Sequence, residues 1–169
     1  MEVFIIAAVS VNGKIAERVD QVSMDWTSKE DMQFFVKKTK EAGNVVMGRT
    51  TFETIGKPLP GRLNVIMTRT PDASKNIDEQ LLYTDKSPKE IVDFLLNKGF
   101  DQVAVTGGAQ VYSAFLKAGL VTDLYLTIEP VLFGTGVPLF EGIERVDLEL
   151  VEHQKLNDQA VMVHYIVKS

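Results

Sequence analysis

The sequence contains no cysteine and only two histidines, so the commonest ligands of protein metal sites are nearly absent. Without cysteine the chain can form neither a disulfide nor a thiolate-bound metal site. His153 and His164 share no spacing with acids or with each other, and we interpret both as structural or surface residues. We therefore expect no metal site. The lack of cysteine also fits the cytoplasm, where thiols stay reduced.

The chain also has no cluster of basic residues and no long apolar run. Its net charge is −5, whereas phosphate backbones need a clustered basic face, so we expect no nucleic-acid binding. The apolar run Val3–Val9 is too short to cross a membrane and follows Glu2 with no basic segment before it. We therefore expect no membrane or targeting segment, and a soluble protein.

The composition and the order of the predicted elements indicate an α/β fold. With 45% hydrophobic and 24% charged residues, and no repeat or linker, residues 1–169 fit a single domain. The predominantly apolar segments at 3–9, 44–47 and 102–105 are typical of strands buried on both faces, and they alternate with amphipathic helices. Two alternating segments, 146–151 and 160–167, predict an antiparallel hairpin. We expect a mostly parallel central sheet of about eight strands, with helices on both faces and an antiparallel C-terminal edge.

The helix that begins near residue 27 carries the most informative acid of the chain. Thr27 and Glu30 have the spacing of a capping box. Asp31 lies at the edge of the apolar stripe, one turn before Phe34 and Phe35. A carboxylate beside aromatic rings loses hydration, which raises its pKa and favours a proton-donating acid near neutral pH. The alternative is that Asp31 caps the first turn, where a negative charge suits the helix dipole.

Two strand-to-helix turns have the chemistry of phosphate cradles. Gly48-Arg49-Thr50 follows one buried strand, and Thr106-Gly107-Gly108-Ala109 follows another. Each turn offers backbone N–H groups at a helix N-terminus, and glycine permits a phosphate to approach closely. Both turns would lie at the carboxyl edge of the sheet, where α/β proteins usually bind ligands.

Three further segments complete the predicted site. Arg62 ends a loop that two prolines make rigid, just before a strand. This position suits bidentate binding of a carboxylate; the alternative is that Arg62 forms a surface salt bridge. Arg69 follows that strand beside Thr68 and is a second candidate anion contact. The long polar loop 10–25 is interpreted as a lid over the site, the alternative being a surface loop without function.

Several segments together resemble the dihydrofolate reductase family. The central signature of that family resembles residues 46–66, VMGRTTFETIGKPLPGRLNVI. Residues 6–9, Trp26 with an acid five residues later, residues 106–112 and residues 124–127 occur in the family's order and at similar spacing. The resemblance covers most of the chain.

The resemblance implies reduction of dihydrofolate by NADPH in tetrahydrofolate biosynthesis and one-carbon metabolism. Asp31 would hydrogen-bond the pteridine and promote protonation at N5, with Trp26 and Thr127 beside it, and Arg62 would pair with the glutamate α-carboxylate of folate. The other implied substrate contacts are Ala8, Met32, Phe35, Ile55 and Leu59. The implied NADPH contacts are Ala7, Ile15, Gly48, Arg49, Thr50, Thr68, Arg69, Thr106, Gly107, Gly108, Ala109, Gln110, Val111 and Tyr112. Of these, Arg49 and Arg69 would bind the 2′-phosphate, and the Gly-Gly peptide would be cis.

Three departures from the family pattern leave alternatives open. Asp25 stands before Trp26, where many members have proline, and the loop from Ile15 to Trp26 is longer than in compact bacterial members. Segment 129–140 is more similar to the pyrimidine reductases of riboflavin synthesis, which use NADPH to reduce a ribosylaminopyrimidine phosphate. A non-catalytic NADPH-binding protein is a further alternative. The sequence does not decide between a monomer and a homodimer.

Overall fold

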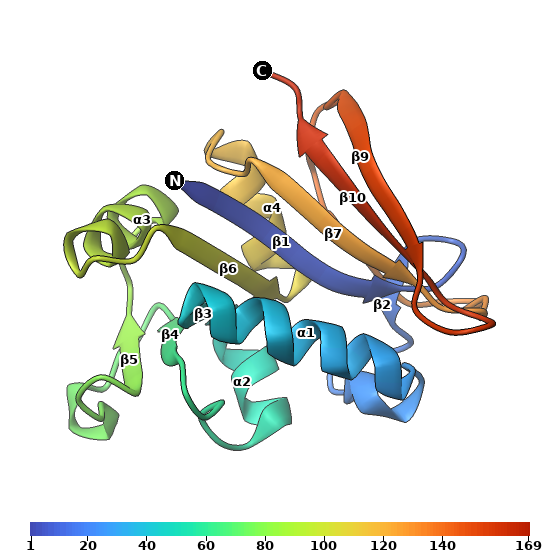
Figure 1. Ribbon diagram of the computed structural model, residues 1–169. Coiled ribbons are helices and arrows are strands. Elements are labelled where there is room, and N and C mark those ends of the chain that lie inside the picture. Colours follow the sequence, from blue (N-terminus) through green and yellow to red (C-terminus); the bar gives the residue numbers. More distant parts are fainter.

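The computed structural model describes residues 1–169, and its centre is an eight-stranded sheet with the strand order β5-β4-β3-β6-β1-β7-β10-β9 (Figure 1). Every neighbouring pair from β5 to β7 is parallel, whereas β10 runs antiparallel to both β7 and β9. The predicted fold class is therefore confirmed. The sheet strands are β1 (Glu2–Val9), β3 (Asn44–Gly48), β4 (Leu63–Met67), β5 (Leu81–Thr84), β6 (Gln102–Gly107), β7 (Asp123–Ile128), β9 (Leu148–Lys155) and β10 (Val161–Val167). The helices are α1 (Lys29–Ala42), α2 (Arg49–Ile55), α3 (Pro88–Asn97) and α4 (Ala109–Lys117).

Successive side chains of the central strands point to opposite faces of the sheet, so the core has two layers, one on each face. Val3 and Ile5 of β1 pack in one layer, which contains the buried side chains of α3 and α4. Phe4 and Ile6 of the same strand pack in the other layer, with side chains from α1 and α2. Because both faces of the strand are covered, its apolar run is continuous and does not alternate with polar residues. Figure 1 shows α1 and α4 on opposite sides of the sheet.

The start of α1 differs from the predicted capping box. The N-cap is Ser28, whose Oγ accepts a hydrogen bond from the backbone N–H of Asp31 at 3.2 Å. Glu30 instead accepts a hydrogen bond from the Asn157 side chain, at 3.3 Å. The predicted box of Thr27 and Glu30 is therefore wrong by one residue, because Ser28 offers an equivalent hydroxyl and contacts another part of the fold. A complete capping box of Ser87 and Glu90 begins α3.

The predicted loop 10–25 contains regular structure at two points. Strand β2 (Lys14–Ala16) pairs antiparallel with β8 (Val137–Pro138), and a short 3-10 helix spans Ser23–Asp25. At residue 136, a Cβ would lie 2.4 Å from the carbonyl oxygen of Ala16, so only glycine fits against this pair of strands. The first half of the segment is therefore held against the segment that follows β7.

The C-terminal hairpin forms as predicted and ends the sheet at β9, an edge strand. His153 is exposed on this strand. His164 on β10 stacks on Tyr125, with ring centroids 4.1 Å apart, and its Nε2 lies 2.7 Å from Asp123 Oδ1. Antiparallel pairing thus brings this histidine to an acid distant in sequence. No helix is both long and apolar enough to cross a membrane.

Candidate active site

The candidate site lies where the parallel strands end at their carboxyl edge. Met47 of β3 stands beside Gly107 of β6, and Ala8 of β1 stands beside Thr127 of β7. Strands that are separated in the sequence therefore bring the two glycine turns and Thr127 to the same edge, as the alternation of strands and helices predicts.

Asp31 is a buried carboxyl group, only 9% exposed. Burial raises its pKa from 3.8 to about 6, and the nearby charge of Glu129 raises it as well. A hydrogen bond from the Thr127 hydroxyl acts in the opposite direction because it favours the ionised form. The effect of burial is the largest, so Asp31 can hold a proton close to neutral pH. Asp31 is therefore not the cap of α1, because the hydroxyl of Ser28 caps this helix.

Glu129 is a second buried acid, only 3% exposed, that the sequence analysis did not select. Its Oε1 accepts hydrogen bonds from the backbone N–H of Ser28 at 2.9 Å and from the Ser28 hydroxyl at 2.7 Å. Its position two residues after Thr127 was a usable signal, because alternate residues of an extended segment point to the same side. Asp25, the acid that stands before Trp26 in the sequence, is exposed.

Arg62 is buried, only 6% exposed, and no carboxylate of the chain pairs with it. Its Nε donates to the carbonyl oxygen of Pro60 at 3.0 Å, and its Nη1 donates to Thr39 Oγ1 at 2.8 Å. Burial lowers the pKa of its guanidinium group, which stays charged at neutral pH. The alternative interpretation, in which Arg62 forms a surface salt bridge, is therefore wrong. Its remaining donors are available to an anion.

Trp26 presents an unpaired donor. Its indole Nε1 is buried and has no hydrogen-bond partner in the chain. The ring packs edge-on against Phe133, with centroids 5.1 Å apart, which fixes the direction of the N–H. A buried donor without a partner costs free energy, so a ligand or an ordered water is the natural partner of this group.

The apolar residues implied as substrate contacts are called the apolar wall here, and they come from β1, α1, α2 and the loop after α2. Phe35 of α1 and Leu59 of the loop after α2 pack against the same core layer. Met32 and Ala8 are half-buried, and Ile55 at the end of α2 is 36% exposed. Asp31 thus lies on the same helix as two of these five residues, Met32 and Phe35.

The two glycine turns fit a phosphorylated cofactor. Gly48 and Gly108 are the N-caps of α2 and α4, and neither helix has a side-chain cap, so their first N–H groups are left for a ligand. A Cβ at Gly48 would lie 3.3 Å from Val111, and one at Gly108 would lie 3.3 Å from Thr51 Oγ1. Larger residues would crowd both turns. The peptide Gly107–Gly108 is cis, as the family resemblance implies.

The other predicted cofactor contacts divide into exposed and structural residues. Arg49, Thr50 and Arg69 are exposed, and Arg49 has only a loose ion pair with Glu53, with Nε and Oε1 3.7 Å apart. Ala7 within β1, Ile15 in the middle of β2 and Thr68 just after β4 are half-buried. Thr106 donates to Val46, and Tyr112 donates its hydroxyl proton to the carbonyl oxygen of Ile6 at 2.9 Å. Ala109 and Val111 are buried at the start of α4.

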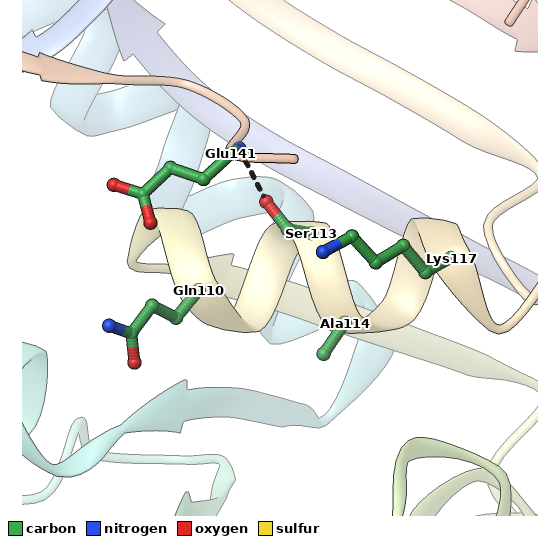
Figure 2. A pocket seen from close by; sticks show the side chains of 5 residues that line it. All are labelled: Gln110, Ser113, Ala114, Lys117 and Glu141. Carbon is green, nitrogen blue, oxygen red and sulfur yellow. Dashed lines mark hydrogen bonds between the residues drawn. The ribbon is translucent and has the colours of Figure 1, made fainter. Parts of the chain in front are cut away.

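A separate surface pocket lies along α4 and does not include Asp31 or Arg62. Figure 2 shows its lining, in which the backbone N–H of Glu141 donates to Ser113 Oγ at 2.8 Å. Its lining residues are Gln110, Ser113, Ala114, Lys117 and Glu141. Gln110 is the only predicted cofactor contact among them. Only one of its five lining residues is hydrophobic, and it contains neither Asp31 nor a residue of the apolar wall.

Comparison with known proteins identifies the family. Residues 2–167 match the dihydrofolate reductase family. The chain belongs to this family. A dihydrofolate reductase from Buchnera aphidicola is 29% identical over 99% of this chain and 98% of that protein. The uncharacterized protein YwjB of Bacillus subtilis is 25% identical over 94% of each chain. Membership of the family indicates a reductase that uses a nicotinamide cofactor on a small-molecule substrate.

Solved structures with the same fold have names from riboflavin synthesis and pyrimidine reduction. A Shewanella protein named for riboflavin biosynthesis has a TM-score of 0.85 and 20% identity, over 100% of both chains. A pyrimidine reductase-like protein from Corynebacterium diphtheriae has a TM-score of 0.80 and 20% identity, over 99% of this chain and 92% of that chain. At this identity the likeness concerns the fold, and the substrate has to be argued from the site.

Proposed function

We propose that this protein reduces 7,8-dihydrofolate to 5,6,7,8-tetrahydrofolate with NADPH. The observation that carries the proposal is a buried acid on α1 together with a buried cation that hydrogen-bonds to Thr39 of the same helix. Asp31 is buried and its pKa is about 6, and Arg62 is buried without a carboxylate partner. A neutral heterocycle with a carboxylate tail matches both groups, because the acid can donate a proton and the cation can bind the tail.

Asp31, Thr127 and Trp26 would handle the pteridine end of the substrate. The carboxyl group of Asp31 would hydrogen-bond the ring and promote protonation at N5. Thr127 would hold that carboxyl group through the hydrogen bond that its hydroxyl donates. The unpaired N–H of Trp26 would bind the ring or an ordered water beside it.

The apolar wall and Arg62 would bind the remainder of the substrate. Stacking and burial against the wall would exclude water from the reacting atoms. Arg62 would form charge-assisted hydrogen bonds with the α-carboxylate of the glutamate tail. The wall residues proposed for this contact are Ala8, Met32, Phe35, Ile55 and Leu59.

NADPH fits the two glycine turns, and when bound it supplies the hydride that reduces C6 of dihydrofolate. The first N–H groups of α2 and α4 would bind its phosphates, and Arg49 and Arg69 would bind the 2′-phosphate. The other proposed contacts are Ala7, Ile15, Gly48, Thr50, Thr68, Thr106, Gly107, Gly108, Ala109, Gln110, Val111 and Tyr112.

The second candidate function is reduction of a ribosylaminopyrimidine phosphate. Segment 129–140 and the names of the structural neighbours favour it. Against it stands Arg62, which is buried and bonds to Pro60 and Thr39, a setting that suits a carboxylate at the end of an apolar substrate. A non-catalytic NADPH-binding protein would have no need for a buried acid such as Asp31.

One assay separates these functions. The decay of NADPH absorbance is followed with dihydrofolate and, in parallel, with the ribosylaminopyrimidine phosphate. We expect turnover of dihydrofolate and little or none of the pyrimidine. Turnover of the pyrimidine alone by folded protein would favour the second candidate, and turnover of neither substrate would contradict both enzymatic candidates.

A further inference from the structure

Two carboxyl groups from different elements meet at the first turn of α1. Asp31 is the third residue of this helix, and Glu129 follows the end of β7, 98 positions later in the sequence. Both side chains are buried, and neither forms an ion pair. Burying a carboxylate without a cation is costly, so the arrangement calls for a reason beyond packing.

Ser28 connects the two acids. Its hydroxyl donates to Glu129 Oε1 at 2.7 Å and accepts from the backbone N–H of Asp31 at 3.2 Å. Its own backbone N–H also donates to Glu129 Oε1, at 2.9 Å. Because one carboxylate oxygen accepts both bonds from Ser28, the first turn of α1 is fixed to the end of β7.

We propose that Glu129 is a positioning residue for Asp31, which it holds in place through Ser28 and influences through a second negative charge. The inference rests on the proposed function, because it assigns Glu129 to the same proton-donating site. Glu129 touches Ser28 and not the reacting atoms. Its effect on the reaction is therefore carried entirely by Asp31.

The charge of Glu129 determines the direction of its influence. Like charges at short range disfavour ionisation of one another, so Glu129 favours the protonated form of Asp31. The other groups around Asp31 are the Thr127 hydroxyl from β7, which favours ionisation, and the buried phenol of Tyr112 from α4, which stays neutral because burial raises its pKa. Glu129 is thus the only charged group among them.

The test removes the negative charge of Glu129 and preserves the shape of its side chain. Glu129→Gln keeps an oxygen that can accept from Ser28, and Glu30→Gln removes an equal charge from the same helix turn as a control. The carboxyl resonances of protein labelled with ¹³C in aspartate are followed from pH 3 to pH 9, with Asp31→Asn to assign Asp31.

We expect Glu129→Gln to lower the titration midpoint of Asp31 by about half to one pH unit, which reduces its protonated fraction at pH 7 about three- to tenfold. Glu30→Gln should leave the midpoint unchanged. The pH profile of single-turnover hydride transfer should shift in the same direction in Glu129→Gln.

Some results would overturn the inference. An unchanged titration midpoint of Asp31 in folded Glu129→Gln would mean that Glu129 only fixes the start of α1 and does not influence Asp31. If that variant does not fold, the Asp31 midpoint in Ser28→Ala decides, because an unchanged midpoint without the hydroxyl that bonds Glu129 contradicts a link through Ser28. The carboxyl titration uses no substrate, so the inference can stand even if dihydrofolate is not turned over, and it can fail while turnover is normal.

Discussion

At the scale of single residues, opposing effects on one carboxyl group determine the chemistry of the site. Asp31 lies in the first turn of a helix, where the dipole favours a negative charge, and Thr127 donates a hydrogen bond that does the same. Burial and Glu129 oppose them, and burial is the largest effect. Asp31 therefore has a pKa of about 6, which leaves a useful protonated fraction near neutral pH.

The first prediction concerns the acid itself. Asp31→Asn cannot donate the carboxyl proton, so hydride transfer at neutral pH should fall by about 10²- to 10⁴-fold, the usual contribution of a general acid. Glu30→Gln, one position earlier on the helix, should have little effect. In the wild-type protein the rate should decrease as the pH rises through about 6, because the neutral acid is lost. Equal losses in both variants, measured in stopped flow, would mean that the acid is misassigned.

The second prediction is that Asp31 makes the protein less stable at neutral pH. Its pKa is raised from 3.8 to about 6 on folding, so ionisation opposes folding and stability is lost as the pH rises through about 6. At about 1.4 kcal/mol per pKa unit, the cost at pH 7 is about 2–3 kcal/mol. Urea unfolding should find Asp31→Asn more stable than the wild type at pH 7, and the two proteins should converge below pH 4.

The third prediction concerns the buried cation. Arg62→Ala should weaken dihydrofolate binding about ten- to hundredfold, because a charge-assisted hydrogen bond contributes about 1.5–3 kcal/mol. The affinity for NADPH should change little, since the glycine turns do not involve Arg62. Isothermal titration with each ligand measures both effects, and Thr39→Val, which removes a contact of Arg62 inside the protein, is the control for local repacking. A comparable loss for both ligands would contradict the assignment.

At the scale of elements, the segment before α1 depends on a contact with a distant segment. Strand β2 is only three residues long and pairs with β8, two residues long, so neither strand would persist alone. The pair exists because both segments extend from the central neighbours β1 and β7. This is why local patterns predicted only a loop at residues 10–25.

The fourth prediction tests this pairing. Gly136→Ala would place a methyl group 2.4 Å from the carbonyl oxygen of Ala16, which is backbone and cannot turn away. Overpacking of this kind costs about 1–3 kcal/mol, and urea unfolding should show a loss of this order. Gly134→Ala is the matched control, because nothing lies within 4 Å of a Cβ there. If both variants are equally stable, β2 and β8 do not pair as described.

At the scale of the whole molecule, the proposed cofactor site exists only when the sheet is complete. The turns at Gly48 and Gly108 belong to β3 and β6, which are neighbours in the sheet but lie about sixty positions apart in the sequence. A ligand that binds both turns binds the folded chain and not the unfolded one. It should therefore stabilise the entire fold and not one element.

The fifth prediction follows from this linkage. NADPH at one hundred times its Kd should raise the free energy of unfolding by about 2.7 kcal/mol. NADH at the same concentration should stabilise the protein less, because Arg49 and Arg69 would find no 2′-phosphate. Thermal unfolding of the wild type and of the double variant Arg49→Ala, Arg69→Ala measures the difference. Equal stabilisation of the wild type by both cofactors would contradict the assignment of Arg49 and Arg69 to the 2′-phosphate.

The sequence by itself determined the fold class, the order of most elements and the positions of Asp31, Arg62 and the two glycine turns. Periodicity, glycine turns and motif spacing are local properties, so they are visible along the chain. Only the tertiary structure decided that Ser28 and not Thr27 caps α1, that Arg62 is buried without an acid, and that Glu129 adjoins Asp31. These features depend on which distant segments meet, because burial and the pairing of charges are set by the contacts of the packed sheet.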